Sequence, residues 1–422
     1  MDILLLGNGF DLHYNFPTKY QNFLMVVGWL TNNYNEKIIT VADVLGNNEL
    51  CSKDTLIKQY YNKYRKCCEK IKLNSTDIDK LIKLAKNNIW FKYLFNSYNK
   101  DVGWIDFERE ISFVCNSFYK FFEYGNFQNV GENKRLKVTL ENKNLNWAER
   151  SIVIKFFDFW VESHDKIFLS DKSTWARYLV NNEYTLNYPS GSVNVVLNKD
   201  KIADFLFNQL KYLSEMLKIY LNNFIEAVSD NLIAEKEIDK WPLVADHVIT
   251  LNYTKTYEKL YKDAKVYHLH GVTTGPIVLG IGPDSNDDVE TIDTIFISFK
   301  KYFQRLRFRT DLDYMDFTNT ITTSDPYANI HLYVVGHSLD STDEEVIKQL
   351  FEISQDITIL CHSLEAIDSY VPNLAKMYGK KGIDRLRNQK KLKFIVTKEE
   401  LDKVISDIER RHSQSLPQVF SF

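Results

Sequence analysis

The stretch Asp2-Ile-Leu-Leu-Leu-Leu6, followed by Gly7-Asn8-Gly9 and Phe10-Asp11, decides the fold of this 422-residue chain. A short, unbroken apolar run is typical of a strand that is buried on both faces, as in a parallel sheet. The glycines end the run, and a helical pattern begins after Pro17. The stretch therefore predicts the first strand, turn and helix of an α/β fold.

The same alternation of strands and helices returns after Pro242. Helical patterns cover Thr254–Tyr261, Asp343–Ile353 and Lys398–Ile408. Strands that alternate with helices predict a Rossmann-like, mostly parallel, doubly wound sheet. The further strands that we expect are His247–Leu251, Lys265–Leu269, Ile277–Ile281, Ile330–Val335, Ile357–Leu360 and Leu392–Val396.

The middle of the chain has a different character, with long aromatic-rich segments. In Ile202–Val228, leucines recur every three or four residues, which is the pattern of a long amphipathic helix. Only Arg135–Leu140 and Ser192–Leu197 look like strands there. We therefore expect residues 1–30 and 240–422 to form the Rossmann-like domain, and residues 31–239 to form a large, mainly α-helical insertion after the first strand–helix unit.

Composition excludes several classes of protein. Lys plus Arg (53) nearly balances Asp plus Glu (56), so nucleic acid is not favoured as a partner. The basic run in 376–393 is interpreted as a solvated helix face rather than a nucleic-acid patch. No apolar stretch of about 20 residues is present, so we expect no membrane span. An odd number of cysteines (5) without a CxxC pair suits a reducing compartment and predicts a cytoplasmic protein.

Polar motifs stand at the carboxyl ends of several predicted strands, where doubly wound sheets bind ligands. Gly7 and Gly9 would let the backbone approach a phosphate, although a tight turn needs glycine for itself. Asp11 would hold a ribose hydroxyl or a catalytic water, or else cap the turn. Asn252 directly follows a strand, and a buried amide needs partners. Thr254 is the expected N-cap of the next helix.

Two further motifs follow later strands. His268 and His270 are two residues apart, so within a strand they would share a face. No third ligand follows at a usual spacing, and we expect no metal. In Gly336-His-Ser338-Leu-Asp340, the glycine permits close approach and Ser338 can donate to a phosphate or ribose oxygen. Leu12 stands where a dinucleotide fingerprint needs its third glycine, which argues against a plain dehydrogenase.

Several of these motifs resemble the AbiH family of bacterial abortive-infection proteins. The resemblance implies a role in anti-phage defence and names no reaction. It covers residues 3 to about 362 and rests on Leu6-Gly-Asn-Gly-Phe-Asp-Leu12, Phe16-Pro-Thr-Lys-Tyr20, Phe23-Leu24, Trp104-Ile-Asp-Phe-Glu108, Leu251–Tyr261, His268-Leu-His-Gly271, Leu279-Gly280 and Gly336-His-Ser-Leu-Asp340.

A more distant resemblance is to the sirtuin-like NAD-consuming fold. It implies that the glycine loop and the Gly-x-Ser turn hold a nucleotide, while the Asn and the His of His-Gly act at the nicotinamide ribose. On this chain those positions are Gly7, Gly9, Asn252, His270 and Ser338. The acidic-Phe-Arg segment and the four-cysteine zinc module of sirtuins are missing, so protein deacetylation is not expected.

We therefore predict an NAD-type glycohydrolase that depletes NAD or a related nucleotide on infection. The alternatives are a nucleotide-sensing or toxin module that acts through a partner protein, and a metal-dependent nuclease built on Asp106, Glu108 or Glu110. A phage-derived trigger and a homo-oligomer stay open. The predicted catalytic residues are His270, Asn252 and Asp11, and the predicted nucleotide-binding residues are Gly7, Asn8, Gly9, His268, Gly336, Ser338 and Asp340.

Overall fold

The computed structural model describes residues 1–415 except 36, 101–105, 131–134, 141–144, 157–158, 160, 169–174, 188–194, 283–293 and 325–328. The chain divides into two compact units. The first comprises Met1–Ile82, Met216–Val278 and Gln304–Phe422, and the second comprises Lys83–Glu215 and Leu279–Phe303. The first unit includes parts of the expected insertion, so the extent of an insertion domain stays a prediction.

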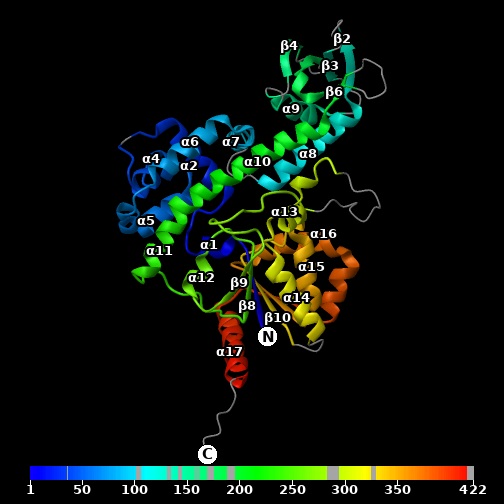
Figure 1. Cartoon of the computed structure of the whole chain (residues 1–422). Coiled ribbons are helices and arrows are strands. Elements are labelled where there is room, and N and C mark those ends of the chain that lie inside the picture. Colours follow the sequence, from blue (N-terminus) through cyan, green and yellow to red (C-terminus); the bar gives the residue numbers. More distant parts are fainter. Residues whose placement is uncertain are drawn as a thin grey trace, which may run out of the picture. The chain divides into compact units, whose positions relative to one another are not determined.

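A six-stranded sheet forms the centre of the first unit (Figure 1). Every neighbouring pair of strands is parallel, which confirms the predicted parallel α/β sheet. The order β12-β11-β10-β1-β8-β9 reverses direction between β1 and β10, as in a doubly wound sheet. The strands are β1 (Asp2–Leu6), β8 (His247–Thr250), β9 (Lys265–His268), β10 (His331–Val335), β11 (Asp356–Leu360) and β12 (Leu392–Ile395).

The first strand is buried on both faces because it lies at the centre of the sheet. Ile3 and Leu5 point into one apolar core, and helices α14 (Leu312–Ser324), α15 (Glu344–Ile353) and α16 (Leu364–Asn388) supply the other side of that core. These three helices lie together beside the strands in Figure 1. The continuous apolar run read from the sequence is thus explained by helices packed on a central strand.

The remaining helices of the first unit connect or flank these strands. The predicted strand Ile277–Ile281 does not form, because its ends make only isolated bridges, Gly271 to Ile277 and Ile281 to Lys300. The helices are α1 (Gly9–His13), α2 (Tyr20–Asn33), α3 (Val41–Leu45), α4 (Asn48–Lys53), α5 (Thr55–Lys70), α11 (Ala227–Ala234), α12 (Thr256–Leu260) and α17 (Lys398–Ser415), and α6 (Ser75–Asn87), α10 (Lys199–Leu221) and α13 (Lys301–Phe308) have residues in both units.

The second unit contains more strand than expected. An antiparallel sheet of order β2-β3-β5-β4 accompanies its helices, and β6 pairs with β7. The predicted strand Arg135–Leu140 is β3, while only the last three residues of the predicted Ser192–Leu197 lie in the described part. The elements are α7 (Ile89–Lys100), α8 (Phe107–Tyr124), α9 (Trp147–Lys155), β2 (Asn126–Val130), β3 (Arg135–Leu140), β4 (Val161–Phe168), β5 (Trp175–Val180), β6 (Thr185–Asn187) and β7 (Val195–Leu197).

Candidate functional site

The loops that follow β1 and β10 contact each other through their backbones at the carboxyl edge of the sheet. The Gly7 N–H donates to the Val335 carbonyl (3.0 Å), and the Gly9 N–H donates to the Gly336 carbonyl (2.8 Å). A Cβ atom at Gly9 would lie 2.5 Å from Cα of Gly336, whose φ is +65°. Glycine is therefore required for the contact between these loops, and in this arrangement the two N–H groups are already engaged by carbonyl oxygens.

Asn252 ties the loop after β8 to the glycine loop. Its side-chain Nδ2 donates to the Gly7 carbonyl at 3.0 Å, and its own N–H donates to the Thr250 hydroxyl at 3.1 Å. The residue is 7% exposed. The sequence-based argument that this buried amide needs partners is thus answered by the backbone of β1's loop.

Asp11, in α1, is a buried carboxyl group with an unsatisfied oxygen. Its Oδ2 accepts a hydrogen bond from the Thr254 hydroxyl at 2.6 Å, while Oδ1 has no hydrogen-bond partner. Burial raises the pKa of Asp11 to about 6, the Thr254 hydroxyl opposes this effect, and the charge of Glu226 adds to it. Thr254 therefore does not cap the next helix as expected, and Lys255 takes the N-cap position of α12. A carboxyl group that titrates near neutral pH is suited to proton transfer.

Glu226 is a residue that sequence reasoning missed. It ends a π-helical turn, Asn222–Glu226, that connects α10 to α11. Its Oε1 accepts from the N–H of Lys255 (2.8 Å), and its Oε2 forms an ion pair with Lys259. A charged residue inside the apolar helix pattern was the available signal, but the π-turn that redirects it is not readable from periodicity.

The two histidines at the end of β9 have different partners. Nε2 of His268 lies 3.0 Å from the Glu258 carboxylate, and this contact lowers the pKa of Glu258. Nε2 of His270 lies 3.1 Å from Oδ1 of Asp343. The strand ends at His268, so the alternation that would have placed both rings on one face does not extend to His270.

Asp343 joins two histidines that come from different strands. Its Oδ2 lies 3.5 Å from Nε2 of His337, whose Nδ1 accepts the Leu339 N–H at 2.9 Å. In neutral His337 the proton must then sit on Nε2, facing the carboxylate. His270, His337 and Asp343 are 4%, 6% and 7% exposed. Sequence reasoning noted Asp343 only as the start of a helix, and no local pattern marked it as a partner of His270.

The other predicted nucleotide-binding residues lie on the same loops with different roles. Asn8 is half-buried and its Oδ1 accepts from the Thr18 hydroxyl at 2.5 Å. Ser338 is exposed, and its carbonyl accepts from the Asn373 amide at 3.0 Å. Asp340 caps a 3₁₀ turn, Ser341–Asp343, by accepting the Thr342 N–H at 3.0 Å.

The carboxylates considered for a nuclease do not form a common site. Asp106 caps α8 by accepting the N–H groups of Glu108 (3.0 Å) and Arg109 (3.1 Å). Glu108 forms an ion pair with Lys301 at 2.7 Å, and Glu110 accepts a hydrogen bond from Tyr93. Each of the three therefore has its own partner within the described part of the second unit.

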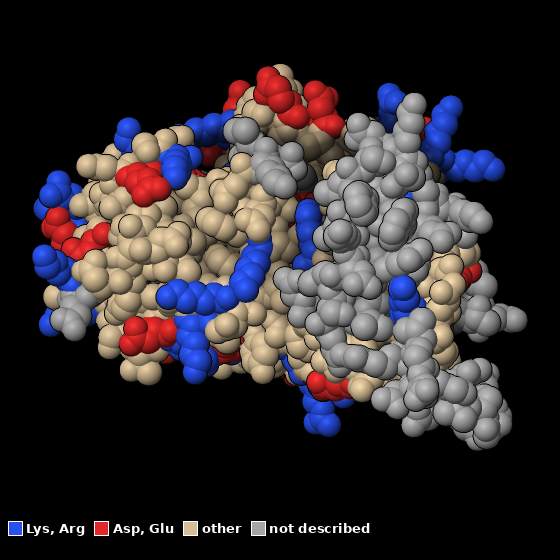
Figure 2. Space-filling model, turned by 90° about the horizontal axis from the view of Figure 1, so that it is seen from above, with Lys and Arg blue, Asp and Glu red and all other residues tan. Residues whose placement is uncertain are grey.

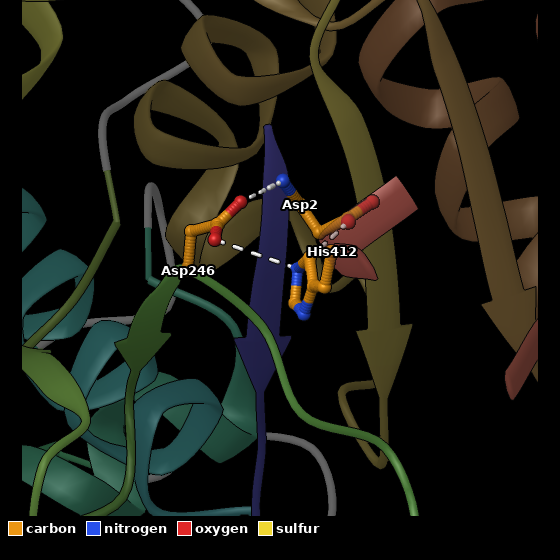
Figure 3. A group of neighbouring side chains, drawn as sticks. All are labelled: Asp2, Asp246 and His412. Atoms are coloured by element: carbon orange, nitrogen blue, oxygen red, sulfur yellow. Dashed lines mark hydrogen bonds and ion pairs between the residues drawn. The ribbon is translucent and has the colours of Figure 1, made fainter. Parts of the chain in front are cut away.

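A separate cluster of ligand-type side chains lies at the opposite, amino edge of the sheet. Atoms of Asp2, Asp246 and His412 lie within 4.8 Å of one another, and Figure 3 shows them joining β1, the loop before β8, and α17. Nη2 of Arg411 donates to Oδ1 of Asp2 at 2.7 Å. A guanidinium thus already neutralises the buried carboxylate, and we interpret the cluster as an ion-pair clasp that holds α17 to β1.

Two surface properties bear on partners. Figure 2 shows acidic and basic side chains scattered over the described part of the face that it draws. In addition, none of the helices formed by the described residues combines the length and the apolar character that crossing a bilayer requires.

Comparison with protein families decides the family. A family model described as bacteriophage abortive infection AbiH matches residues 3–363. The chain belongs to the AbiH family. Membership implies a function in abortive infection by phage, as the sequence motifs predicted. Comparisons with curated proteins and with solved structures found no match. The matched range of this AbiH chain contains the glycine loop, Asn252, His270 and Asp343, and it ends before α16, β12 and α17.

Proposed function

We propose that this AbiH-family protein hydrolyses a nucleotide of the NAD type at the carboxyl edge of its sheet, and so depletes that nucleotide on infection. The observation that carries the proposal is the buried pair of His270 and Asp343, 3.1 Å apart, on loops that follow β9 and β10. A histidine held by a carboxylate is a well-suited general base. Ligands of doubly wound sheets bind at this edge, near the reversal of strand order.

The proposed reaction breaks the bond between the nicotinamide nitrogen and the ribose, and water adds to the ribose carbon. With Nε2 of His270 donating to Asp343, neutral His270 accepts the proton of a ribose hydroxyl on Nδ1. The Asp343 carboxylate stabilises the resulting imidazolium. Asp11 accepts the proton that the attacking water loses, since its pKa of about 6 allows both protonation states near neutral pH. General base catalysis contributes roughly 10²- to 10⁴-fold to such a rate.

The order of the motifs supports NAD as the nucleotide. The glycine loop, Asn252, His270-Gly271 and Gly336-His-Ser338 follow one another as in the sirtuin-like NAD-consuming fold. Because the N–H groups of Gly7 and Gly9 already donate to the loop after β10, the proposal assigns the pyrophosphate to Ser338 and Asn8, the less buried members of the same loops.

The test is release of nicotinamide from NAD by the purified protein, with and without extract from phage-infected cells. We expect His270→Ala, Asn252→Ala and Asp11→Asn to abolish or strongly reduce release. His362→Ala is the matched control, because His362 is exposed and lies outside the proposed site. No release under any of these conditions, or undiminished release by all three variants, would rule out the proposed reaction.

Binding without turnover is the second candidate function. The engaged N–H groups of Gly7 and Gly9 favour it, because a phosphate would have to displace the loop after β10. Such a sensor would show a rise in melting temperature with NAD and no nicotinamide over hours. Mass spectrometry of small molecules retained by the purified protein would identify its ligand.

A further inference from the structure

The second half of α16 and the turn into β12 carry an unusual density of positive charge. Residues 376–393 contain eight Lys or Arg and one acidic residue, Asp384, a balance of +7 in a chain whose net charge is −3. Lys376, Lys380, Lys381, Arg385, Arg387, Lys390 and Lys393 are all exposed, and we call these seven residues the α16 basic surface.

The core-facing side of the same helix explains why the cations point outward. Leu374, Met377 and Leu386 are 1%, 5% and 4% exposed and belong to the apolar core beside the sheet. The helix breaks at Gly379, where φ is +61°. The apolar face of α16 is therefore already occupied by the protein's own core, and only polar and charged side chains are offered to a partner by residues 380–390 apart from Gly382 and the partly buried Ile383.

The basic surface differs from the other solvated helices of this chain. Elsewhere, exposed cations pair with carboxylates one turn away, as in Arg65–Glu69 (2.8 Å) in α5 and Lys403–Glu399 (3.1 Å) in α17. Residues 376–393 are all described, and within them none of the seven cations forms an ion pair, although Asp384 lies among them. Unpaired like charges repel one another and weaken the folded state.

A neighbouring lysine records this crowding. Burial, and next the charge of Arg385, lower the pKa of Lys391, which is half-buried between β12 and α15. Its Nζ donates to the carbonyl of Glu352 at 3.4 Å. An anionic partner would relieve the repulsion that the fold leaves uncompensated.

We propose that the α16 basic surface binds nucleic acid through its phosphate backbone. A polyphosphate presents closely spaced negative charges that match a run of unpaired Lys and Arg on a helix and the turn beyond it. Contacts of this kind carry little sequence information, so binding is expected to be independent of sequence. Anionic membrane is the less favoured partner, because surface-bound helices insert apolar side chains, and those of this segment face the core.

This surface is distinct from the carboxyl edge and does not depend on the proposed hydrolase. Because β11 and β12 are parallel, α16 starts at the carboxyl edge and must return the chain to the amino edge, where β12 begins. The basic half of α16 therefore lies toward the edge opposite to His270. It also lies beyond residue 363, where the family match ends.

The test is fluorescence anisotropy of labelled single-stranded RNA, single-stranded DNA and duplex DNA at increasing salt. The charge-reversal variant carries Lys380→Glu, Lys381→Glu, Arg387→Glu and Lys390→Glu. We expect the full-length protein to bind, and the variant to lose at least about tenfold in affinity and roughly 3 to 4 in the salt slope, close to one for each phosphate contact. The matched control reverses four exposed lysines outside the surface, Lys58, Lys66, Lys83 and Lys86, and so has the same net charge.

The outcomes separate the partners. The control should bind within about twofold of the wild-type protein, and circular dichroism should show both variants folded. Absence of binding, equal losses in the two variants, or binding to phosphatidylglycerol vesicles that nucleic acid does not compete away would each overturn the proposal.

Discussion

Nε2 of His270 lies 3.1 Å from Oδ1 of Asp343, although 73 residues separate them along the chain. The second oxygen of the same carboxylate lies 3.5 Å from Nε2 of His337. Each oxygen thus faces one imidazole nitrogen in a buried environment, where an ion pair or charged hydrogen bond is strong and an unpaired partner is costly. Asp343 is therefore the residue whose removal most directly tests the candidate site.

Asp343→Asn is expected to impair both activity and stability. The amide keeps the shape but cannot stabilise positive charge on His270, so nicotinamide release should fall by roughly 10²-fold or more. Loss of two buried charge-assisted hydrogen bonds should lower the free energy of unfolding by about 1 to 3 kcal/mol. Urea denaturation and the NAD assay measure the two effects. Glu344→Gln, the adjacent residue in a surface pair with Lys348, should change neither appreciably.

Asp11 should make stability depend on pH with a predictable sign. Its pKa in the folded protein is about 6 against an ordinary value of 3.8, so folding favours the protonated form. The stabilising contribution is complete below the lower value and is lost as the pH rises through the higher one. The two values correspond to about 3 kcal/mol.

Comparison with Asp11→Asn isolates this contribution. The free energy of unfolding of the wild-type protein minus that of the variant should fall between about pH 4 and pH 7. A difference that stays constant over this interval would mean that the carboxyl group is not perturbed in solution.

Gly336→Ala should be far more damaging than Gly379→Ala. Both glycines have positive φ values, +65° and +61°, so alanine is strained at each by about 1 to 2 kcal/mol. A Cβ atom at Gly336 would lie 2.5 Å from the backbone carbon of Gly9, while at Gly379 nothing lies within 4 Å. We expect a loss of roughly 3 to 5 kcal/mol for Gly336→Ala, the strain and the overpacking together. Equal thermal shifts for the two variants would contradict the loop contact.

The clasp at the amino edge is tested by two neighbouring arginines of α17. Arg411→Gln leaves the carboxylate of Asp2, which is 1% exposed, without its cation, and should cost about 2 to 4 kcal/mol. Arg410→Gln removes only an exposed pair with Asp407 and should cost less than about 0.5 kcal/mol. Hydrogen exchange should show faster exchange in α17 and β1 for the first variant alone.

Local pattern was sufficient for the central sheet. The apolar run Asp2–Leu6 and four of the later runs that alternate with helical periodicity are parallel strands, because burial between layers of helices selects such runs wherever they occur. The run Ile277–Ile281 had the same composition and forms no strand, since an apolar run also satisfies a loop that packs into a core. The motifs were equally sufficient for the family.

The partners of the site residues were decided by the tertiary structure. The sequence by itself determined that glycines, Asn252 and His270 follow strands and so meet at one edge of a parallel sheet. Only the fold decided that the glycines face each other, that Thr254 donates to Asp11 and that Asp343 holds His270. Such pairs join residues far apart in the chain, and local periodicity carries no information about them, because strand order and loop approach depend on the packing of the whole sheet.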